Sequence, residues 1–254
     1  MKSCKVLFIF LLFILPLVSF AQNSDTTEVT TRFGATVTLT SKGISTIPNL
    51  SLGKPALLFD LTMGRKLSFD PMFRFSLEGK PWTFIFWFRY QVLNNNRFQL
   101  TVGAHPAFSY STKTYILGEV FEDVQIVRRY VAEEVAPMYK FTKSISAGLY
   151  YLHANGIDPN TTKATNLVAV RANFSNIRLS EKLYMRINPQ VYYLTMDGSD
   201  GFYINSTFAL AIKNFPLSVS GLVNQPIKTD IAAGNELLWN VSLVYTFIND
   251  YVKK

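Results

Sequence analysis

Between Trp82 and Val92, apolar and polar side chains alternate along the chain. One set, aromatic or aliphatic throughout, is Trp82, Phe84, Phe86, Phe88, Tyr90 and Val92. The intervening set is Thr83, Ile85, Trp87, Arg89 and Gln91. Because successive side chains of a strand point to opposite faces, the pattern predicts a strand with one apolar face and one face that carries polar groups. Its eleven residues also match the length that a tilted strand needs to cross a bilayer.

Similar segments recur along the chain and predict an all-β, antiparallel fold of about twelve strands. The predicted strands are 29–40, 52–62, 67–77, 82–92, 97–106, 124–136, 143–153, 165–174, 183–194, 202–213, 215–225 and 236–247. The sixth is the least regular, because charged residues interrupt its alternation. No segment has a helical period of useful length, and no linker divides residues 22–254, so we expect a single domain.

The lengths of the predicted connections depend on whether their number along the chain is even or odd. The even-numbered ones, near 63–66, 93–96, 137–142, 175–182 and 214, are short. Four odd-numbered ones, at 41–51, 107–123, 154–164 and 226–235, are longer, whereas 78–81 and 195–201 break the trend. In an up-and-down antiparallel sheet, alternate connections lie at the same end. The sequence therefore predicts tight turns at one end and long loops at the other.

The size of the sheet indicates which face looks outward. About eight strands enclose an interior that side chains can fill, and more strands leave open space. A soluble twelve-strand barrel lined with Phe, Trp and Leu would enclose a large dry void. With the apolar face turned towards lipid, the same pattern predicts a polar interior that water can enter. A soluble two-sheet sandwich is the alternative fold.

The N-terminus predicts an export signal. Lys2 and Lys5 precede the almost wholly apolar segment 6–18, and Ser19-Phe20-Ala21 places small residues where signal peptidase cleaves, so we expect residues 1–21 to be removed. The single cysteine, Cys4, lies inside this segment, so no disulfide is expected. Cleavage leaves 23 basic against 17 acidic residues. These charges are scattered among aromatic strands, which argues against a nucleic-acid partner.

Together, the signal, the alternating strands and the sorted connections resemble the outer-membrane β-barrel proteins of Gram-negative bacteria. The resemblance covers the whole predicted mature chain and is architectural, with no motif that selects a subfamily. It implies a transmembrane barrel in the bacterial outer membrane, with lipid as its partner, short periplasmic turns and longer extracellular loops. One departure is the C-terminus, because the chain continues beyond Phe247 to Lys254, whereas such proteins often end in an aromatic residue.

Aromatic residues near the predicted strand ends indicate two girdles at headgroup depth. The outer girdle would contain Phe75, Trp82, Tyr193, Phe202 and Trp239, and the periplasmic one Phe69, Tyr90, Phe98, Phe215 and Phe247. The competing explanation is the general preference of aromatic residues for strands.

The predicted inward face carries the candidate site residues. If Leu77 pairs with Trp82, Asp70 lies directly opposite Arg89. Arg171 would face Arg186, with Glu133 or Glu134 supplying the counter-charge across the lumen. These residues, with Arg74, form either a salt-bridge network that plugs the barrel or a constriction that selects small anionic solutes.

Two functions follow from this arrangement. The barrel either conducts small solutes, with Arg74, Arg89, Arg171 and Arg186 selecting charge, or acts as a structural or interaction protein through the loops 107–123 and 226–235. The sequence does not determine the solute or the oligomeric state.

An enzyme is not expected. A lipid-modifying hydrolase is the remaining alternative, because His105 and His153 lie near predicted outer strand ends and Ser109 and Ser111 follow His105. However, no strand carries a recognisable serine–histidine motif. The sequence also predicts no cofactor and no transition-metal site, and residues 197–201 are expected to form a tight turn.

Overall fold

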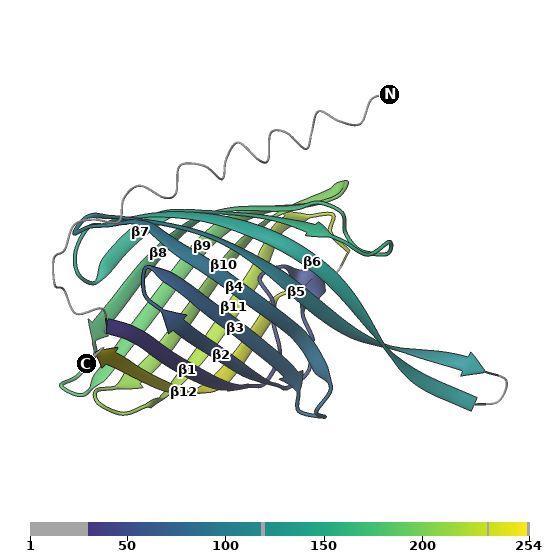
Figure 1. Ribbon diagram of the computed structural model, residues 1–254, viewed down its shortest axis with the longest axis horizontal. Coiled ribbons are helices and arrows are strands. Elements are labelled where there is room, and N and C mark those ends of the chain that lie inside the picture. Colours follow the sequence, from purple (N-terminus) through teal and green to yellow (C-terminus); the bar gives the residue numbers. More distant parts are fainter. Residues whose placement is uncertain (1–29, 118–119, 233, 253–254) are drawn as a thin grey trace, which may run out of the picture.

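The computed structural model describes residues 30–117, 120–232 and 234–252, and the predicted signal peptide lies outside them. Twelve antiparallel strands follow one another around a closed barrel (Figure 1). Closure is made by β1 and β12, which pair from Thr30↔Val252 to Thr40↔Ser242. The strands are β1 (Thr30–Thr40), β2 (Ala56–Gly64), β3 (Leu67–Ser76), β4 (Pro81–Asn94), β5 (Phe98–Leu117), β6 (Val120–Lys140), β7 (Ile145–Gly156), β8 (Thr165–Arg178), β9 (Leu183–Met196), β10 (Ser199–Ile212), β11 (Leu217–Thr229) and β12 (Leu238–Val252).

The predicted strand number is confirmed, but two strands are much longer than expected. β5 has 20 residues and β6 has 21, so most of the predicted loop 107–123 belongs to a hairpin that projects from the barrel (Figure 1). The C-terminal extension is also strand, because Ile248 pairs with Gly34 and Val252 with Thr30. Closure therefore uses residues beyond Phe247 that the predicted last strand left out.

The connections are sorted between the two ends of the barrel. Those at one end are short and cover 65–66, 95–97, 141–144, 179–182 and 213–216. At the other end, 41–55, 157–164 and 230–237 are long, and 77–80 and 197–198 are the two short exceptions that the sequence indicates. Tight turns use residues that tolerate positive φ, such as Asp197 (53°), Asn214 (59°) and Gly79 (79°).

The apolar faces point outward, as predicted. Val170 is 61% exposed and Leu243 is 47% exposed on the outer wall. Arg89 points into the barrel, where it forms ion pairs. Among the described residues, no helix is long and apolar enough to span a membrane. The outer wall is therefore a belt suited to acyl chains, and the charged face looks inward.

The interior is not uniformly polar, which corrects the prediction of a hydrated lumen throughout. Inward-facing residues of β8, β9 and β10 form an apolar cluster with Ile231 of the 230–237 loop; its members are Leu167, Ala169, Tyr192, Leu194, Met196, Tyr203 and Ile231. Ile47 of the 41–55 connection packs against this cluster. The two long loops thus seal one side of the barrel at the long-loop end.

The 41–55 connection is held inside by hydrogen bonds from two strands. Tyr192 Oη donates to the Thr46 carbonyl at 2.9 Å, and Trp82 Nε1 donates to the Leu50 carbonyl at 3.0 Å. A short 3-10 helix, η1 (Pro48–Leu50), lies between these anchors. The loop therefore crosses the interior from the apolar cluster to β4.

Candidate functional site: the barrel lumen

The centre of the lumen contains a network built around Arg89 of β4. Its Nε donates to Glu134 Oε1 at 2.7 Å and its Nη1 to Asp70 Oδ2 at 3.0 Å. Tyr150 Oη donates to the other oxygen of Glu134 at 2.8 Å, and Ser68 Oγ donates to Asp70 at 3.0 Å. Four strands thus converge on one guanidinium, which two carboxylates compensate.

The predicted partnership of Asp70 and Arg89 is therefore present, but its register differs. Asp70 pairs with Trp87 and Ser68 pairs with Arg89, so the ion pair runs diagonally between strands. The turn between β3 and β4 covers 77–80 rather than 78–81, and this shifts each pairing by two residues. Long side chains bridge the diagonal because such neighbours lie only about 7–8 Å apart.

The predicted contact between Arg171 and Arg186 does not form. Arg171 pairs with Gln190, whereas Arg186 pairs with Ala209 of β10. The cause is again the turn, because β8 continues to Arg178 and places the β8–β9 connection at 179–182. Arg186 shares the inward face of β9 with Gln190, nearer the short-turn end.

Glu134, rather than Glu133, is the lumen carboxylate of β6. Glu134 is 5% exposed and binds Arg89, whereas Glu133 lies on the exposed outer face. Ala132, Glu134 and Ala136 are buried in alternation, so the parity of β6 places Glu133 outside. The charged residues of this strand had obscured that parity in the sequence.

Trp82 also lies elsewhere than predicted. It is 3% exposed, and it contacts the inward loop instead of belonging to the outer girdle. A β-bulge explains its position, because the pairing Arg74↔Thr83 is followed by Phe75↔Pro81 and leaves Trp82 as the extra residue. The guanidinium of Arg74 lies 5.6 Å from the centre of its ring.

The other predicted girdle residues remain on the outer wall. Those that are at least 40% exposed are Tyr90, Phe202, Phe215, Trp239 and Phe247. Phe98 and Tyr193 are half-buried, and the ring of Tyr193 lies 4.6 Å from that of Phe202. Their depth relative to lipid headgroups stays a prediction.

Three cavities lie inside the barrel along β2 to β6, and the central one also extends to residues of β7, β8, β9 and β11. The outer vestibule, about 440 Å³, includes Trp82, Ser109, Glu78, Lys80 and Asp123. The central chamber, about 500 Å³, includes Arg74, Trp87, Arg89, Tyr150 and Arg171. The lower chamber, about 450 Å³, includes Thr62, Asp70, Arg89, Gln91 and Thr101.

Shared residues mark the boundaries between these cavities. Trp82, Leu50 and Ser109 line both the outer vestibule and the central chamber. Arg89 lines both the central and the lower chambers. The cavities thus form a series, with an aromatic boundary at Trp82 and a charged boundary at Arg89.

The inward face also carries buried polar atoms without a hydrogen-bond partner in the described part of the chain. They are Asp60 Oδ1, Asp70 Oδ1, Arg74 Nε, Ser76 Oγ, His105 Nδ1, Ser111 Oγ and Arg171 Nε. Such groups are costly unless water or a ligand satisfies them. Their common direction, into the barrel, indicates that this side of the lumen is hydrated.

The two histidines occupy different faces. His105 is 8% exposed, and its ring centre lies 4.0 Å from that of Trp87 in the lumen. His153 faces outward and forms hydrogen bonds with Asn166 (2.8 Å) and Asn155 (2.9 Å). In the described part of the chain, neither ring is hydrogen-bonded to a serine, so the predicted serine–histidine alternative has no assembled pair.

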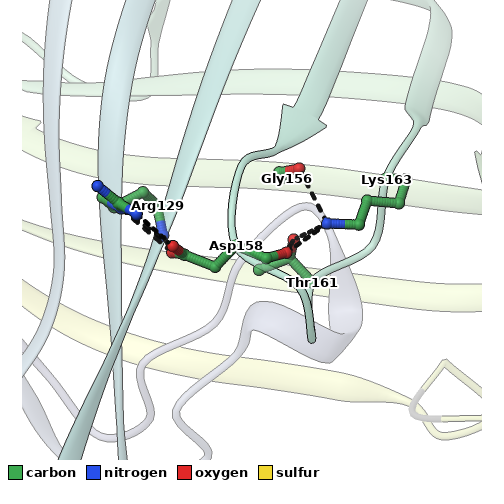
Figure 2. Close-up of polar contacts among 5 residues, drawn as sticks. All are labelled: Arg129, Gly156, Asp158, Thr161 and Lys163. Carbon is green, nitrogen blue, oxygen red and sulfur yellow. Dashed lines mark hydrogen bonds and ion pairs between the residues drawn. The ribbon is translucent and has the colours of Figure 1, made fainter.

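Outside the membrane-spanning wall, the 157–164 connection is tied to the projecting strand β6. The carboxylate of Asp158 accepts hydrogen bonds from the backbone N–H of Arg129 at 2.7 Å, from its Nη2 at 2.6 Å and from its Nε at 3.1 Å (Figure 2). These hydrogen bonds lower the pKa of Asp158 below its usual value. Lys163 Nζ donates to the Asp158 carbonyl, which folds the connection back on itself. Asp197 of the predicted tight turn accepts the backbone N–H groups of Lys163 and Ala164.

Comparison with protein-family models and with curated proteins found no match. Among solved structures, one similar fold is the KdgM porin in complex with disordered oligogalacturonate, at 9% identity, 85% coverage of this chain, 99% of that one and a TM-score of 0.49. A second is an outer membrane channel from Pseudomonas putida F1, at 10% identity, 90% and 99% coverage and a TM-score of 0.47. LpxR from Salmonella typhimurium has 9% identity, 85% and 99% coverage and a TM-score of 0.44. At these values, no property of those proteins is transferred to this chain.

The chain's own structure defines its class. A closed barrel leaves no unpaired strand edge, and its belt of exposed apolar side chains faces away from a charged interior. The protein has the fold of a transmembrane β-barrel of the outer-membrane type. In such barrels the short turns are periplasmic and the long loops are extracellular.

Proposed function

We propose that this barrel is a passive channel for small polar solutes, with a route through three cavities that lie along β2 to β6 and that extend, in the central chamber, as far as β8 and β9. The observation that carries the proposal is the series of three cavities that meet at Trp82 and Arg89. The unpartnered polar atoms on the same face support a hydrated path. The apolar cluster of β8 to β10 fills part of the interior at the long-loop end, and it borders the central chamber through Leu167 and Met196.

The charges along this route support a passage of limited selectivity. Arg89 faces two carboxylates, Asp70 and Glu134, so the central network by itself has one more negative group than positive, and the positive Arg74 and Arg171 in the same chamber oppose this excess. Of the two sequence-based alternatives, a salt-bridge network fits Arg89, whereas attraction of anions fits Arg74 and Arg171, which form no ion pair within 4.0 Å in the described part of the chain. Arg186 remains a proposed contributor near the periplasmic end.

Planar-bilayer recording in KCl tests the proposal. The purified wild-type barrel is expected to give discrete conductance steps, and Trp82→Ala should enlarge them about twofold or more by opening the boundary between vestibule and central chamber. The matched control is Trp239→Ala, because Trp239 is 50% exposed on the outer wall and borders no chamber. A correctly folded barrel without discrete steps, both as wild type and as Trp82→Ala, would exclude the channel.

A second candidate function, partner binding, is favoured by the projecting hairpin. β5 pairs with β4 only as far as Ser109, and β6 pairs with β7 only from Tyr130. Beyond these points, the two strands pair only with each other in the described part of the chain, and they expose Tyr115, Val124 and Val127. Deleting residues 112–125 should abolish partner capture while conductance and membrane insertion persist; unchanged capture would exclude the hairpin.

A further inference from the structure

Two arginines on different walls of the central chamber lack a carboxylate partner. Arg74 comes from β3 and Arg171 from β8, with β4 to β7 between them along the barrel wall. In the described part of the chain, neither guanidinium lies within 4.0 Å of a carboxylate oxygen, in contrast to Arg89 between Asp70 and Glu134. Both Nε atoms are buried without a hydrogen-bond partner.

Each of these guanidinium groups is held by an aromatic ring. Arg171 lies 4.8 Å from the centre of the Tyr150 ring, and Arg74 lies 5.6 Å from that of Trp82. Stacking on a ring orients the planar guanidinium and leaves its N–H groups available to an acceptor. Both groups are therefore arranged before any ligand arrives, which reduces the ordering cost of binding.

The nearby carboxylates do not occupy these positions. Glu134 is engaged by Arg89 and Tyr150, at 2.7 and 2.8 Å. Asp60 attracts Arg74 through space, but it forms no ion pair with Arg74, and its Oδ1 has no hydrogen-bond partner. An anion that enters the chamber thus meets two guanidinium groups that no carboxylate of the described residues binds. Arg74 Nη2 donates to the sulfur of Met72, at 3.8 Å, and Asp60 is a nearby group that would repel the anion.

We propose that the central chamber binds an elongated dianion, such as a linear dicarboxylate, with one carboxylate at Arg74 and the other at Arg171. The proposal rests on the proposed function in one respect, because the solute must enter the lumen. A guanidinium is well suited to a carboxylate, since two N–H groups match its two oxygens. A chamber of about 500 Å³ holds such a ligand together with water.

Two of the three tryptophans, Trp82 and Trp87, line the chamber, so their fluorescence reports on binding. The full-length mature barrel carrying Trp239→Phe is titrated in detergent with succinate, adipate, propionate and neutral hexanediol at constant ionic strength. We expect one dicarboxylate length to bind at least tenfold more tightly than propionate, and hexanediol to give no saturable change. Equal affinity for propionate and for every dicarboxylate would overturn the proposal without any variant.

Variants then assign the two anchors. Arg74→Gln and Arg171→Gln should each reduce dicarboxylate affinity to that of propionate, and Asp60→Asn should strengthen it several-fold by removing the repulsion. Arg178→Gln is the matched control, since Arg178 lies at the end of β8 and lines none of the three cavities, and it should leave affinity unchanged. An equal loss in Arg178→Gln would indicate general attraction of anions and overturn the assignment.

The outcome can be separated from that of the channel proposal. Conductance in KCl is measured on the same preparation, and it depends on an open route rather than on the two anchors. Conductance without dicarboxylate preference would reject the dianion site alone. Saturable dicarboxylate binding without conductance would reject the channel alone, and circular dichroism confirms that each variant is folded.

Discussion

Two regions of the barrel interior differ in the side chains that they turn inward, although the same apolar outer wall surrounds both. At the long-loop end of β8 to β10, an apolar cluster of inward side chains meets Ile47 and Ile231 from two long loops. Along β2 to β6, the inward side chains include Asp70, Arg74, Arg89 and Glu134, and they border three cavities. The outer wall is apolar around both halves. Lipid therefore constrains the outside uniformly, whereas the inside can be sealed on one side and hydrated on the other.

The largest expected effect comes from opening the sealed half at Tyr192, which is 1% exposed and holds Thr46 and Asn224 through its hydroxyl. Tyr192→Ala removes a buried ring and should lower the free energy of unfolding by about 3–5 kcal/mol. Conductance should also rise, because the 41–55 connection loses an anchor. Denaturant unfolding and bilayer recording measure the two effects.

Tyr192→Phe is the matched variant, because it keeps the ring and removes only the hydroxyl. It should cost about 1–2 kcal/mol, corresponding to the lost hydrogen bonds. If Tyr192→Ala left both stability and conductance unchanged, the apolar half would not be a seal.

In the hydrated half, removing a negative charge or the positive charge from the central network should shift the preference between anions and cations in opposite directions. Glu134→Gln leaves Arg89 with one carboxylate and should favour anions several-fold, whereas Arg89→Gln leaves Asp70 and Glu134 uncompensated and should favour cations. Reversal potentials in a KCl gradient give the sign directly. Shifts of the same sign in both variants would show that the ion path avoids this network.

Substitutions at two neighbouring residues of β6, Glu133 and Glu134, compare the outer face of the barrel with its inner face. Glu133 faces outward beside the lipid-facing Val131 and Val135, so Glu133→Val should raise the free energy of unfolding in bilayers by about 1 kcal/mol. Glu134→Val should lower it, because Arg89 loses a buried counter-charge. Unfolding by urea in lipid vesicles measures both, and effects of equal sign would contradict the assigned faces.

The smallest effect concerns the 157–164 connection at the rim. Arg129 lowers the pKa of Asp158 in the folded state, so this contact contributes above the ordinary carboxyl pKa of about 3.9 and is lost as the pH falls through the lowered value. The protection of the amides in this connection, taken relative to the intrinsic exchange rate at each pH, should therefore fall below about pH 4. Asp158→Asn should exchange faster at neutral pH and lose this pH dependence; unchanged exchange would show that other contacts hold the loop.

Much of the site was predictable from alternation alone, since Arg74, Arg89 and Arg171 all line the lumen as expected. These three placements were predictable because the face on which a side chain lies depends only on its even or odd position within one strand. The displaced partners of Arg89 and Arg171 trace to turns whose positions differ by one or two residues, and in a hairpin any such displacement shifts every pairing. Glu134 could have been identified from Ala132 and Ala136, whose small side chains share its face.

The amino-acid sequence by itself determined the strand number, the face that meets lipid and the end that carries the long loops. These properties depend on side-chain periodicity and on turn residues that act over a few positions. Only the tertiary structure decided that Trp82 turns inward at a bulge and that the interior divides into two halves. The contact of Tyr192 with Thr46 spans 146 positions, and no local pattern encodes which loop fills a space that forms only when the barrel closes.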